Sequence, residues 1–205
     1  MAAMSRSAHR LPARFVLYWT VATTIGLSVS LPGATIAGVI ALLSLDGPGP
    51  GWTALLAALA LALTTPLGIS QWVVLRRTWL DTPLWIPATM IGFTIGSVAG
   101  AAALSTIGIG GFGALLGASI GFAQSLILKR HLKRSGLWIL ATTAATAAAY
   151  VPAVALVRHF FGPYRYAEWP PLPAILLGVV SGSALFGAAT GLLLRWLVRL
   201  SRGGE

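Results

Sequence analysis

The chain contains no cysteine among its 205 residues. Disulfide bonds, thiolate nucleophiles and cysteine-ligated metals are therefore excluded. Charge is almost as scarce, because only 9% of the residues are charged, against about 25% in an ordinary soluble domain. Hydrophobic residues make up 57% of the chain. A soluble fold cannot hide this much apolar surface, so the composition predicts an integral membrane protein.

Acidic residues are few: the chain has four of them and 14 basic residues, which gives a net charge of +10. In a soluble protein this balance would suggest nucleic acid as a partner. Here the basic residues stand in short clusters between apolar runs, which favours membrane topology over nucleic-acid binding. The excess of Arg over Lys, beside abundant Ala, Gly and Leu, is typical of a GC-rich bacterial genome.

Ionisable side chains are missing from the middle of the apolar runs. Buried ionisable groups mark proton relays and coupled ion paths, so their absence argues against a proton-driven transporter. No nucleophile stands with a base inside a run, which argues against an enzyme. The sequence leaves any cofactor unknown, including whether a pigment, lipid or ion is bound.

Long apolar runs divide the chain into membrane-spanning segments. A helix needs about 20 apolar residues to cross the hydrocarbon core. The runs lack the alternation of barrel strands, so helices are expected. Six segments qualify: about 15–44, 53–75, 84–106, 109–128, 137–158 and 173–196. We therefore predict an all-α bundle of six transmembrane helices that forms one domain over residues 1–205.

The first segment is longer than a span requires, and Pro32 and Gly33 fall inside it. This pair predicts either a kink or a half-helix followed by a re-entrant stretch. The preceding arginines also raise the possibility of a cleaved signal peptide. Residues 19–26 match residues 85–92, however, and a discarded leader has no reason to carry the pattern of the mature protein.

The basic residues set the orientation, because twelve of them fall on one side of the six segments and only Arg158 and Arg165 fall on the other. The positive-inside rule then places both termini in the cytoplasm, in the plasma (inner) membrane of a bacterium. The twelve are Arg6, Arg10, Arg14, Arg76, Arg77, Lys129, Arg130, Lys133, Arg134, Arg195, Arg199 and Arg202.

A block of sequence recurs, first at residues 68–77 and again at residues 121–130. A third, weaker copy ends the last segment, and each copy follows a segment that opens with Trp and carries Ala-Thr three and four positions later. The opening residues are Trp19, Trp85 and Trp138. Such repeats indicate three two-helix hairpins, at about 15–77, 84–130 and 137–199. Two helices return the chain to its starting side, so the hairpins are parallel and predict a pseudo-threefold ring.

Small residues recur at every fourth position on four of the segments. This spacing places them on one helix face and lets backbones approach closely. The face serves either dimerisation or packing within the chain, and the number of helices to be packed favours the latter. The stripes are Gly92, Gly96 and Gly100; Gly113, Gly117 and Gly121; Ala141, Ala145, Ala149 and Ala153; and Ser183, Gly187 and Gly191.

Three polar residues occupy the same repeat position, namely Gln71, Gln124 and Thr190. A buried amide is costly unless it is paired. Each lies five residues before a basic residue, or roughly 7–8 Å below the cytoplasmic boundary. One interpretation is a locking layer in which Gln bonds a neighbouring helix and the repeat tryptophans sit in the aromatic belt. The other is that the three residues line a site or vestibule on the axis.

The outer loop 158–169 is the most chemically varied stretch. Its mixture of His, Glu, Arg and aromatic residues favours anchoring at lipid headgroups, with docking of a ligand or partner as the alternative and catalysis a third possibility. The candidate contacts are Arg158, His159, Tyr164, Arg165, Glu168 and Trp169.

The repeated pattern Gly-x-x-Gln-Trp-x-x-Leu-Arg-Arg, followed by Trp-Ile-x-Ala-Thr-x-x-Gly, resembles uncharacterised multi-spanning bacterial membrane proteins. The resemblance covers the second to fifth segments well. The sixth departs from it, with Thr190 in place of the Gln and Trp196 in place of the second Arg. The resemblance implies six spans and no particular activity.

Taken together, these features predict a non-catalytic accessory or structural subunit of a membrane complex, packed through its small-residue faces. Its expected partners are membrane lipid and other membrane subunits or further copies of itself. The alternative is a small channel or permease for a neutral or lipidic solute, which predicts a cavity lined by Gln71, Gln124 and Thr190.

Overall fold

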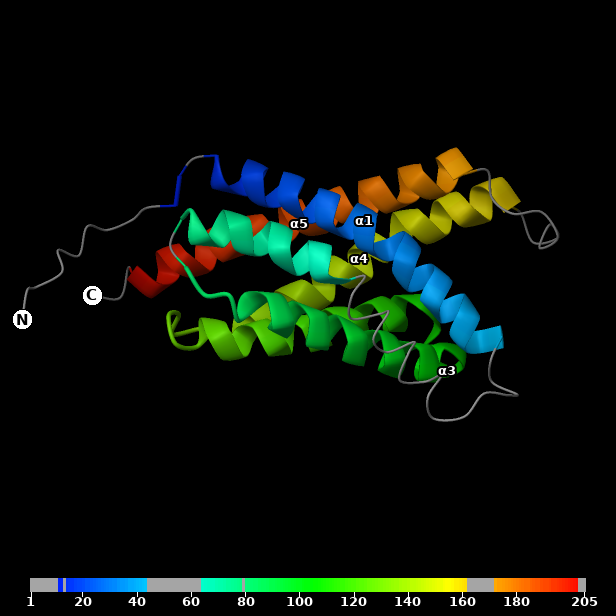
Figure 1. Ribbon diagram of the computed structural model, residues 1–205, viewed down its shortest axis with the longest axis horizontal. Coiled ribbons are helices and arrows are strands. Elements are labelled where there is room, and N and C mark those ends of the chain that lie inside the picture. Colours follow the sequence, from blue (N-terminus) through cyan, green and yellow to red (C-terminus); the bar gives the residue numbers. More distant parts are fainter. Residues whose placement is uncertain (1–10, 13, 44–63, 79, 162–171, 203–205) are drawn as a thin grey trace, which may run out of the picture.

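The computed structural model describes residues 11–12, 14–43, 64–78, 80–161 and 172–202. It describes backbone alone at 31–43, 101–102, 104–105, 109, 151–161, 172–175 and 202. All regular secondary structure in this part of the chain is helical, which confirms the all-α prediction (Figure 1). The labelled helices are α1 (Phe15–Leu43), α3 (Trp85–Leu128), α4 (Gly136–Phe161) and α5 (Leu172–Arg202). A further helical stretch covers residues 64–76 before α3.

Helix α3 is two helices joined at Gly108, where the backbone has φ 64° and ψ −173°. This positive φ is a conformation that only glycine adopts without strain. The two halves run back along each other, because a Cβ at Gly92 would lie 2.7 Å from Ile120 Cα, and one at Gly100 would lie 2.7 Å from a ring carbon of Phe112. The two halves correspond to the predicted segments 84–106 and 109–128.

Helix α1 continues through Pro32 and Gly33 to Leu43 without a break. Its second half is tilted away from the first (Figure 1). A proline inside a helix removes one backbone hydrogen bond and is a usual cause of such a bend. The backbone therefore follows the kinked alternative and shows no re-entrant stretch at this point.

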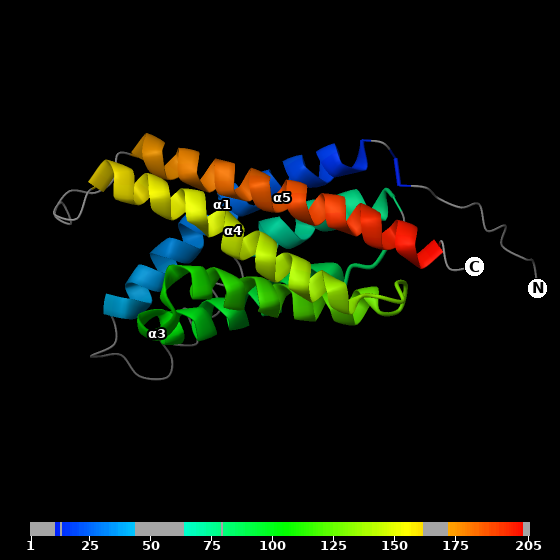
Figure 2. The same cartoon turned by 180° about the vertical axis from the view of Figure 1, so that it is seen from behind.

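The basic turns gather at one end of the bundle. The start of α1, the turn between residues 76 and 85, the turn between α3 and α4, and the end of α5 all lie there (Figures 1 and 2). Arg14, Arg76, Lys129, Lys133 and Arg199 are exposed at this end. The opposite end holds the Gly108 turn and the ends of α1 and α4 that face away from the basic residues.

Close backbone contacts link the helices into a closed ring. A Cβ at Gly68 would lie 3.1 Å from Ile86 Cα, which joins the 64–76 stretch to the first half of α3. The second half of α3 packs on α4, where a Cβ at Gly121 would lie 2.9 Å from Ile139 Cα. Helix α4 packs on α5, and α5 returns to α1, where a Cβ at Gly187 would lie 3.0 Å from Thr20 Cα.

The small-residue stripes are therefore used inside the chain. Gly92 and Gly96 face the other half of α3, Gly113 faces Tyr150 and Ala147 of α4, and Gly191 faces the Trp19 ring. These contacts confirm intrachain packing. The prediction that the chain meets its partners through its small-residue faces is wrong for these glycines, because their faces are already covered.

By length and composition alone, two helical segments of the described chain are long and apolar enough to cross a membrane, Gly110–Leu128 and Leu176–Ser201. Three shorter apolar helical stretches accompany them, Phe15–Ser30, Trp85–Gly100 and Gly136–Tyr150. The helical backbone of α1, α3 and α4 continues beyond each of these three.

Candidate functional site

Three tryptophans, one from each repeat, pack against one another near the basic end of the bundle. The ring centroids of Trp19 and Trp85 lie 6.2 Å apart, those of Trp85 and Trp138 6.3 Å, and those of Trp19 and Trp138 6.4 Å. The side chains are at most 1% exposed. This near-equilateral triangle fills the centre of the ring, and its pairs adopt the edge-on and tilted geometries that aromatic rings prefer.

Each indole donates a hydrogen bond to the repeat preceding its own around the ring. Trp85 Nε1 donates to Gln71 Oε1 at 3.1 Å, and Trp138 Nε1 donates to Gln124 Oε1 at 2.9 Å. Trp19 Nε1 closes the cycle by donating to Thr190 Oγ1 at 3.0 Å. The three bonds join all three hairpins into one ring.

The amide groups of the glutamines are also paired. Gln71 Nε2 donates to Thr23 Oγ1 at 3.4 Å, and Gln124 Nε2 donates to Thr89 Oγ1 at 2.9 Å. Gln124 Nε2 also lies 3.3 Å from Gln71 Oε1, so the two amides meet directly. The two threonines occupy the Ala-Thr position four residues after the repeat Trp. That position was visible in the sequence, but its role as acceptor was not.

The third repeat departs from the other two. Thr190 accepts from Trp19 and donates to the Phe186 carbonyl oxygen of its own helix at 2.7 Å. Thr142, the third residue of the Ala-Thr set, donates to the Trp138 carbonyl oxygen at 2.9 Å. Thr89 makes the same bond to the Trp85 carbonyl oxygen but also accepts from Gln124, whereas no amide side chain among the described residues donates to Thr142.

Apolar residues seal the polar layer on both sides. Leu75, Leu128 and Leu194 hold one repeat position on the basic side and are fully buried. Leu67, Ile120 and Phe186 hold another on the far side and are at most 5% exposed. Because hydrogen bonds strengthen when water is excluded, this sandwich makes the paired amides a firm connection and an unpaired one costly.

The structure places Gln71, Gln124 and Thr190 in one buried layer, each bonded to an indole. Their side chains are at most 2% exposed, and none of them lines the cavity described below. The expectation that the repeat tryptophans sit in an aromatic belt is wrong, since belt residues face the lipid headgroups and these three face one another. Their shared repeat position fixed their depth but not the direction in which they point.

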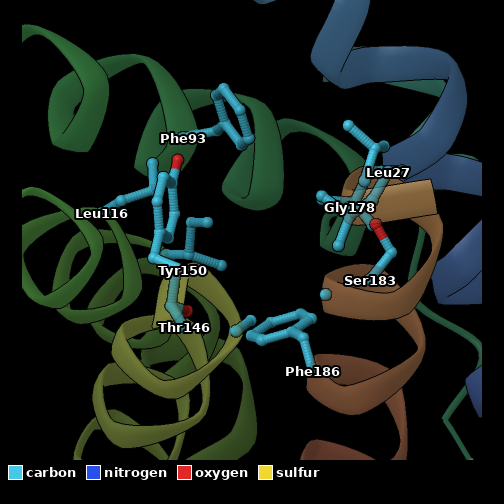
Figure 3. Close-up of a pocket in the computed structure, with 13 residues that line it drawn as sticks. Leu27, Phe93, Leu116, Thr146, Tyr150, Gly178, Ser183 and Phe186 are labelled. Atoms are coloured by element: carbon cyan, nitrogen blue, oxygen red, sulfur yellow. The ribbon is translucent and has the colours of Figure 1, made fainter. Parts of the chain in front are cut away.

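A partly open cavity of about 230 Å³ lies between the helices, on the far side of the polar layer. All six helical segments contribute to its wall. Figure 3 shows Phe93, Leu116 and Tyr150 on one side of it, and Leu27 and Ser183 on the other. Most of the described lining is apolar, and no charged side chain is among the described residues that form it.

The structure places none of the side chains of the outer-loop candidates. Tyr164, Arg165, Glu168 and Trp169 lie outside the described residues. Arg158 and His159 belong to α4 as backbone only, so their side chains are not placed. Among the residues that the structure does describe, no three His, Asp or Glu side chains come together to form a metal site.

Comparisons with protein-family models, with curated proteins and with solved structures find no match for this chain.

Proposed function

We propose that the chain is a six-span integral membrane protein that acts as a non-catalytic accessory or structural subunit of a membrane complex. The lengths of α1, α4 and α5 support the proposal. Helix α1, for example, has 29 residues and a length of about 43 Å, against about 30 Å for the hydrocarbon core. Helices α4 and α5 have 26 and 31 residues.

The outward faces of the helices support the proposal. Val98, Leu140 and Leu177 are each more than half exposed, at 67%, 67% and 59%. Large aliphatic residues stand on the outside of every described helical segment. Such surfaces mark contact with lipid or with other membrane proteins. Since the glycine faces are taken up within the chain, a protein partner would bind this aliphatic surface.

The observation that carries the structural role is the closed hydrogen-bond cycle around the tryptophans. Its indole N–H groups and amide oxygens are hydrogen-bonded within the layer, so the layer offers a solute no free group and no space. A role in holding the hairpins together accounts for every bond in it. The channel or permease alternative called for a cavity lined by Gln71, Gln124 and Thr190, whereas the described cavity is lined by other residues and Trp19, Trp85 and Trp138 fill the bundle beside it.

Orientation can be tested cleanly because the chain has no cysteine of its own. Gly110 and Gly136 are matched positions, since both are exposed and a Cβ at either would meet nothing within 4 Å. A membrane-impermeant maleimide should label Gly110→Cys in intact spheroplasts and Gly136→Cys only after permeabilisation. The reverse pattern would overturn the orientation, and labelling of both from outside would overturn the six spans.

The subunit role predicts an assembly of fixed composition. A tagged chain at its natural expression level, extracted with its surrounding lipid in polymer-bounded discs, should appear in native mass spectrometry at one defined mass above the monomer. Phe122→Ala and Trp196→Ala, which cut back two exposed aromatic side chains, should weaken that assembly. A chain that always appears alone would sink the proposal, whatever its topology.

A further inference from the structure

The cavity lies where the third repeat carries small residues in place of large ones. Counted from the repeat glycines, Gly178 and Gly182 of α5 stand at the positions of Phe112 and Leu116 in the second repeat. Counted from the repeat tryptophans, Thr146 stands where the second repeat has Phe93. All of these residues except Phe112 line the cavity. The small residues of the third repeat therefore leave empty a volume that large side chains at the same positions would fill.

One polar group in this space lacks a partner. Ser183 is 2% exposed, lines the cavity, and its Oγ has no hydrogen-bond partner among the described residues. An unpaired buried hydroxyl costs about 1–3 kcal/mol, so native structures seldom leave one without a role. Ser181, two residues earlier on the same helix, is exposed and donates to the Leu177 carbonyl oxygen at 2.7 Å. Ser28, Ser30, Trp72 and Ser201 also carry a buried polar atom without a partner among the described residues, and Ser183 is the one of these five that lines the cavity.

A second hydroxyl stands across the space. Tyr150 of α4 lines the side next to Phe93 and Leu116, whereas Ser183 lines the side next to Leu27 (Figure 3). The Tyr150 ring is held by an edge-to-face contact with Phe112, with ring centroids 5.5 Å apart. Both hydroxyls can donate a hydrogen bond. The cavity therefore presents a donor on each of two facing walls and apolar contacts between them.

The volume limits what fits. An engineered apolar cavity of about 150 Å³ holds benzene, whereas pockets for drug-sized ligands begin at about 300 Å³. At about 230 Å³ the space suits one substituted ring, and because it is partly open a longer molecule would place only its head group there. The described lining residues carry no charge, so they offer an ion nothing to compensate its lost hydration and favour a neutral ligand.

We propose that this cavity is a binding site for a neutral single-ring molecule with an oxygen at each end, the chemistry of a 1,4-quinone or hydroquinone. Ser183 and Tyr150 bind the two oxygens, and Phe93, Leu116 and Phe186 pack against the ring. The tryptophan layer closes the site toward the basic end, so the cavity is a pocket and not a passage. The proposal is independent of the subunit role, since a subunit with or without this ligand would still assemble.

The experiment uses two probes of the same shape. Duroquinone (tetramethyl-1,4-benzoquinone) carries both oxygens, and durene (1,2,4,5-tetramethylbenzene) carries neither. Each is equilibrated by dialysis with the full chain in lipid nanodiscs, and empty nanodiscs give the share that dissolves in lipid. We expect duroquinone to saturate at one equivalent per chain and to bind more tightly than durene.

Substitutions at Ser183 and Tyr150 test whether these two hydroxyls bind the oxygens of the probe. Ser183→Ala should weaken duroquinone binding about tenfold, the loss of one hydrogen bond, and leave durene binding unchanged. Tyr150→Phe should act in the same direction, and the matched control Ser181→Ala should change neither probe. Ser183→Leu, which removes the hydroxyl and occupies the space, should exclude both probes while thermal unfolding verifies that the protein is folded.

Three results would overturn the proposal: no saturable duroquinone binding, equal affinity for the two probes, or equal effects of Ser183→Ala and Ser181→Ala. A quinone with a ten-carbon tail identifies the source of the ligand. Binding as tight as that of duroquinone supports the site and indicates the head group of a lipid-soluble quinone. Exclusion of the tailed quinone, with duroquinone still bound, supports the site and indicates a free small molecule.

Discussion

Trp19 in α1 and Thr190 in α5 are joined by a hydrogen bond of 3.0 Å from indole Nε1 to Oγ1, although 171 positions separate them in the chain. The two corresponding bonds, from Trp85 and Trp138, join hairpins that are neighbours in sequence. The Trp19 bond is the one that turns a row of three hairpins into a ring. It is also the one whose acceptor is a hydroxyl and not an amide.

Replacing Thr190 with Val tests this closure. The change keeps the shape of the side chain but leaves the Trp19 N–H buried and unpaired. We expect a loss of about 1 kcal/mol, between the average for interhelical hydrogen bonds in membranes and the full cost of an unpaired donor. The measurement is SDS-titrated unfolding in mixed micelles. Thr94→Val is the control, because its hydroxyl donates only to the Met90 carbonyl oxygen of its own helix; equal losses would contradict the closing role.

Of the three Trp→Phe variants, Trp138→Phe should be the most costly, although all three lose the same volume from fully buried sites. Gln124 Oε1 accepts from Trp138 alone, so Trp138→Phe strands it. Gln71 Oε1 keeps a donor in Gln124 when Trp85 is replaced, and Thr190 keeps its bond to the Phe186 carbonyl when Trp19 is replaced. Trp138→Phe should therefore cost about 1–2 kcal/mol more than either of the others in the same unfolding titration.

The comparison is informative because the three substitutions remove the same volume from sites of nearly equal burial. If Trp138→Phe were not the most costly of the three variants, the assignment of hydrogen bonds within the layer would be wrong.

Gly92→Ala should destabilise the fold. The added Cβ would lie 2.7 Å from Ile120 Cα and 2.8 Å from the Ser119 carbonyl oxygen, both backbone atoms that cannot turn aside. Overpacking costs about 1–3 kcal/mol, whereas the gain in helix propensity is at most about 1 kcal/mol, so the loss wins. Gly136→Ala is the control, because its Cβ would meet nothing within 4 Å. Thermal unfolding in detergent compares them, and a stabilised Gly92→Ala would refute the close helix contact.

Gly108→Ala should also destabilise the protein, but for a conformational reason. No atom lies within 4 Å of a Cβ placed there, yet φ is 64°. A non-glycine residue in this region costs about 1–3 kcal/mol. Gly110→Ala, two residues away and equally open, should be neutral or slightly stabilising. Equal unfolding temperatures for the two variants would show that the turn can relax and that the positive φ is not required.

Much of this architecture could be read from spacing, because a repeat fixes the depth at which each residue lies. Shared offsets placed Gln71, Gln124 and Thr190 at one level, and the turn at Gly108 followed from the shortest connection between segments. The direction in which each side chain points around its helix axis was harder to predict. The offsets did not tell whether Trp85 faces lipid or the centre, and tryptophan's preference for the membrane interface pointed the wrong way. Only the three-dimensional ring shows that three buried indoles fill the middle together.

The cavity escaped sequence reasoning for a related reason. Gly178 and Gly182 look like ordinary small residues that let helices approach, and Ser183 looks like part of a packing stripe. Their effect depends on comparison with Phe112 and Leu116 in the second repeat, which fill the equivalent volume. The sequence therefore indicated the cavity only through a difference between repeats, namely small residues in the third where the second has large ones. A search for what the repeats share does not find such a difference.

The closed cycle of indole bonds has a consequence for connectivity. Each hairpin gives one indole to its neighbour and receives one from the other, and the start of α1 lies at the same end of the bundle as the end of α5. The acceptors differ, since Thr190 stands where the other two hairpins have a glutamine, but the direction of donation is the same at all three joints. A circular permutant that links the old termini and opens between Lys129 and Arg134 would keep every one of these bonds. The order of the hairpins is thus a property of the gene, and the ring itself has no beginning.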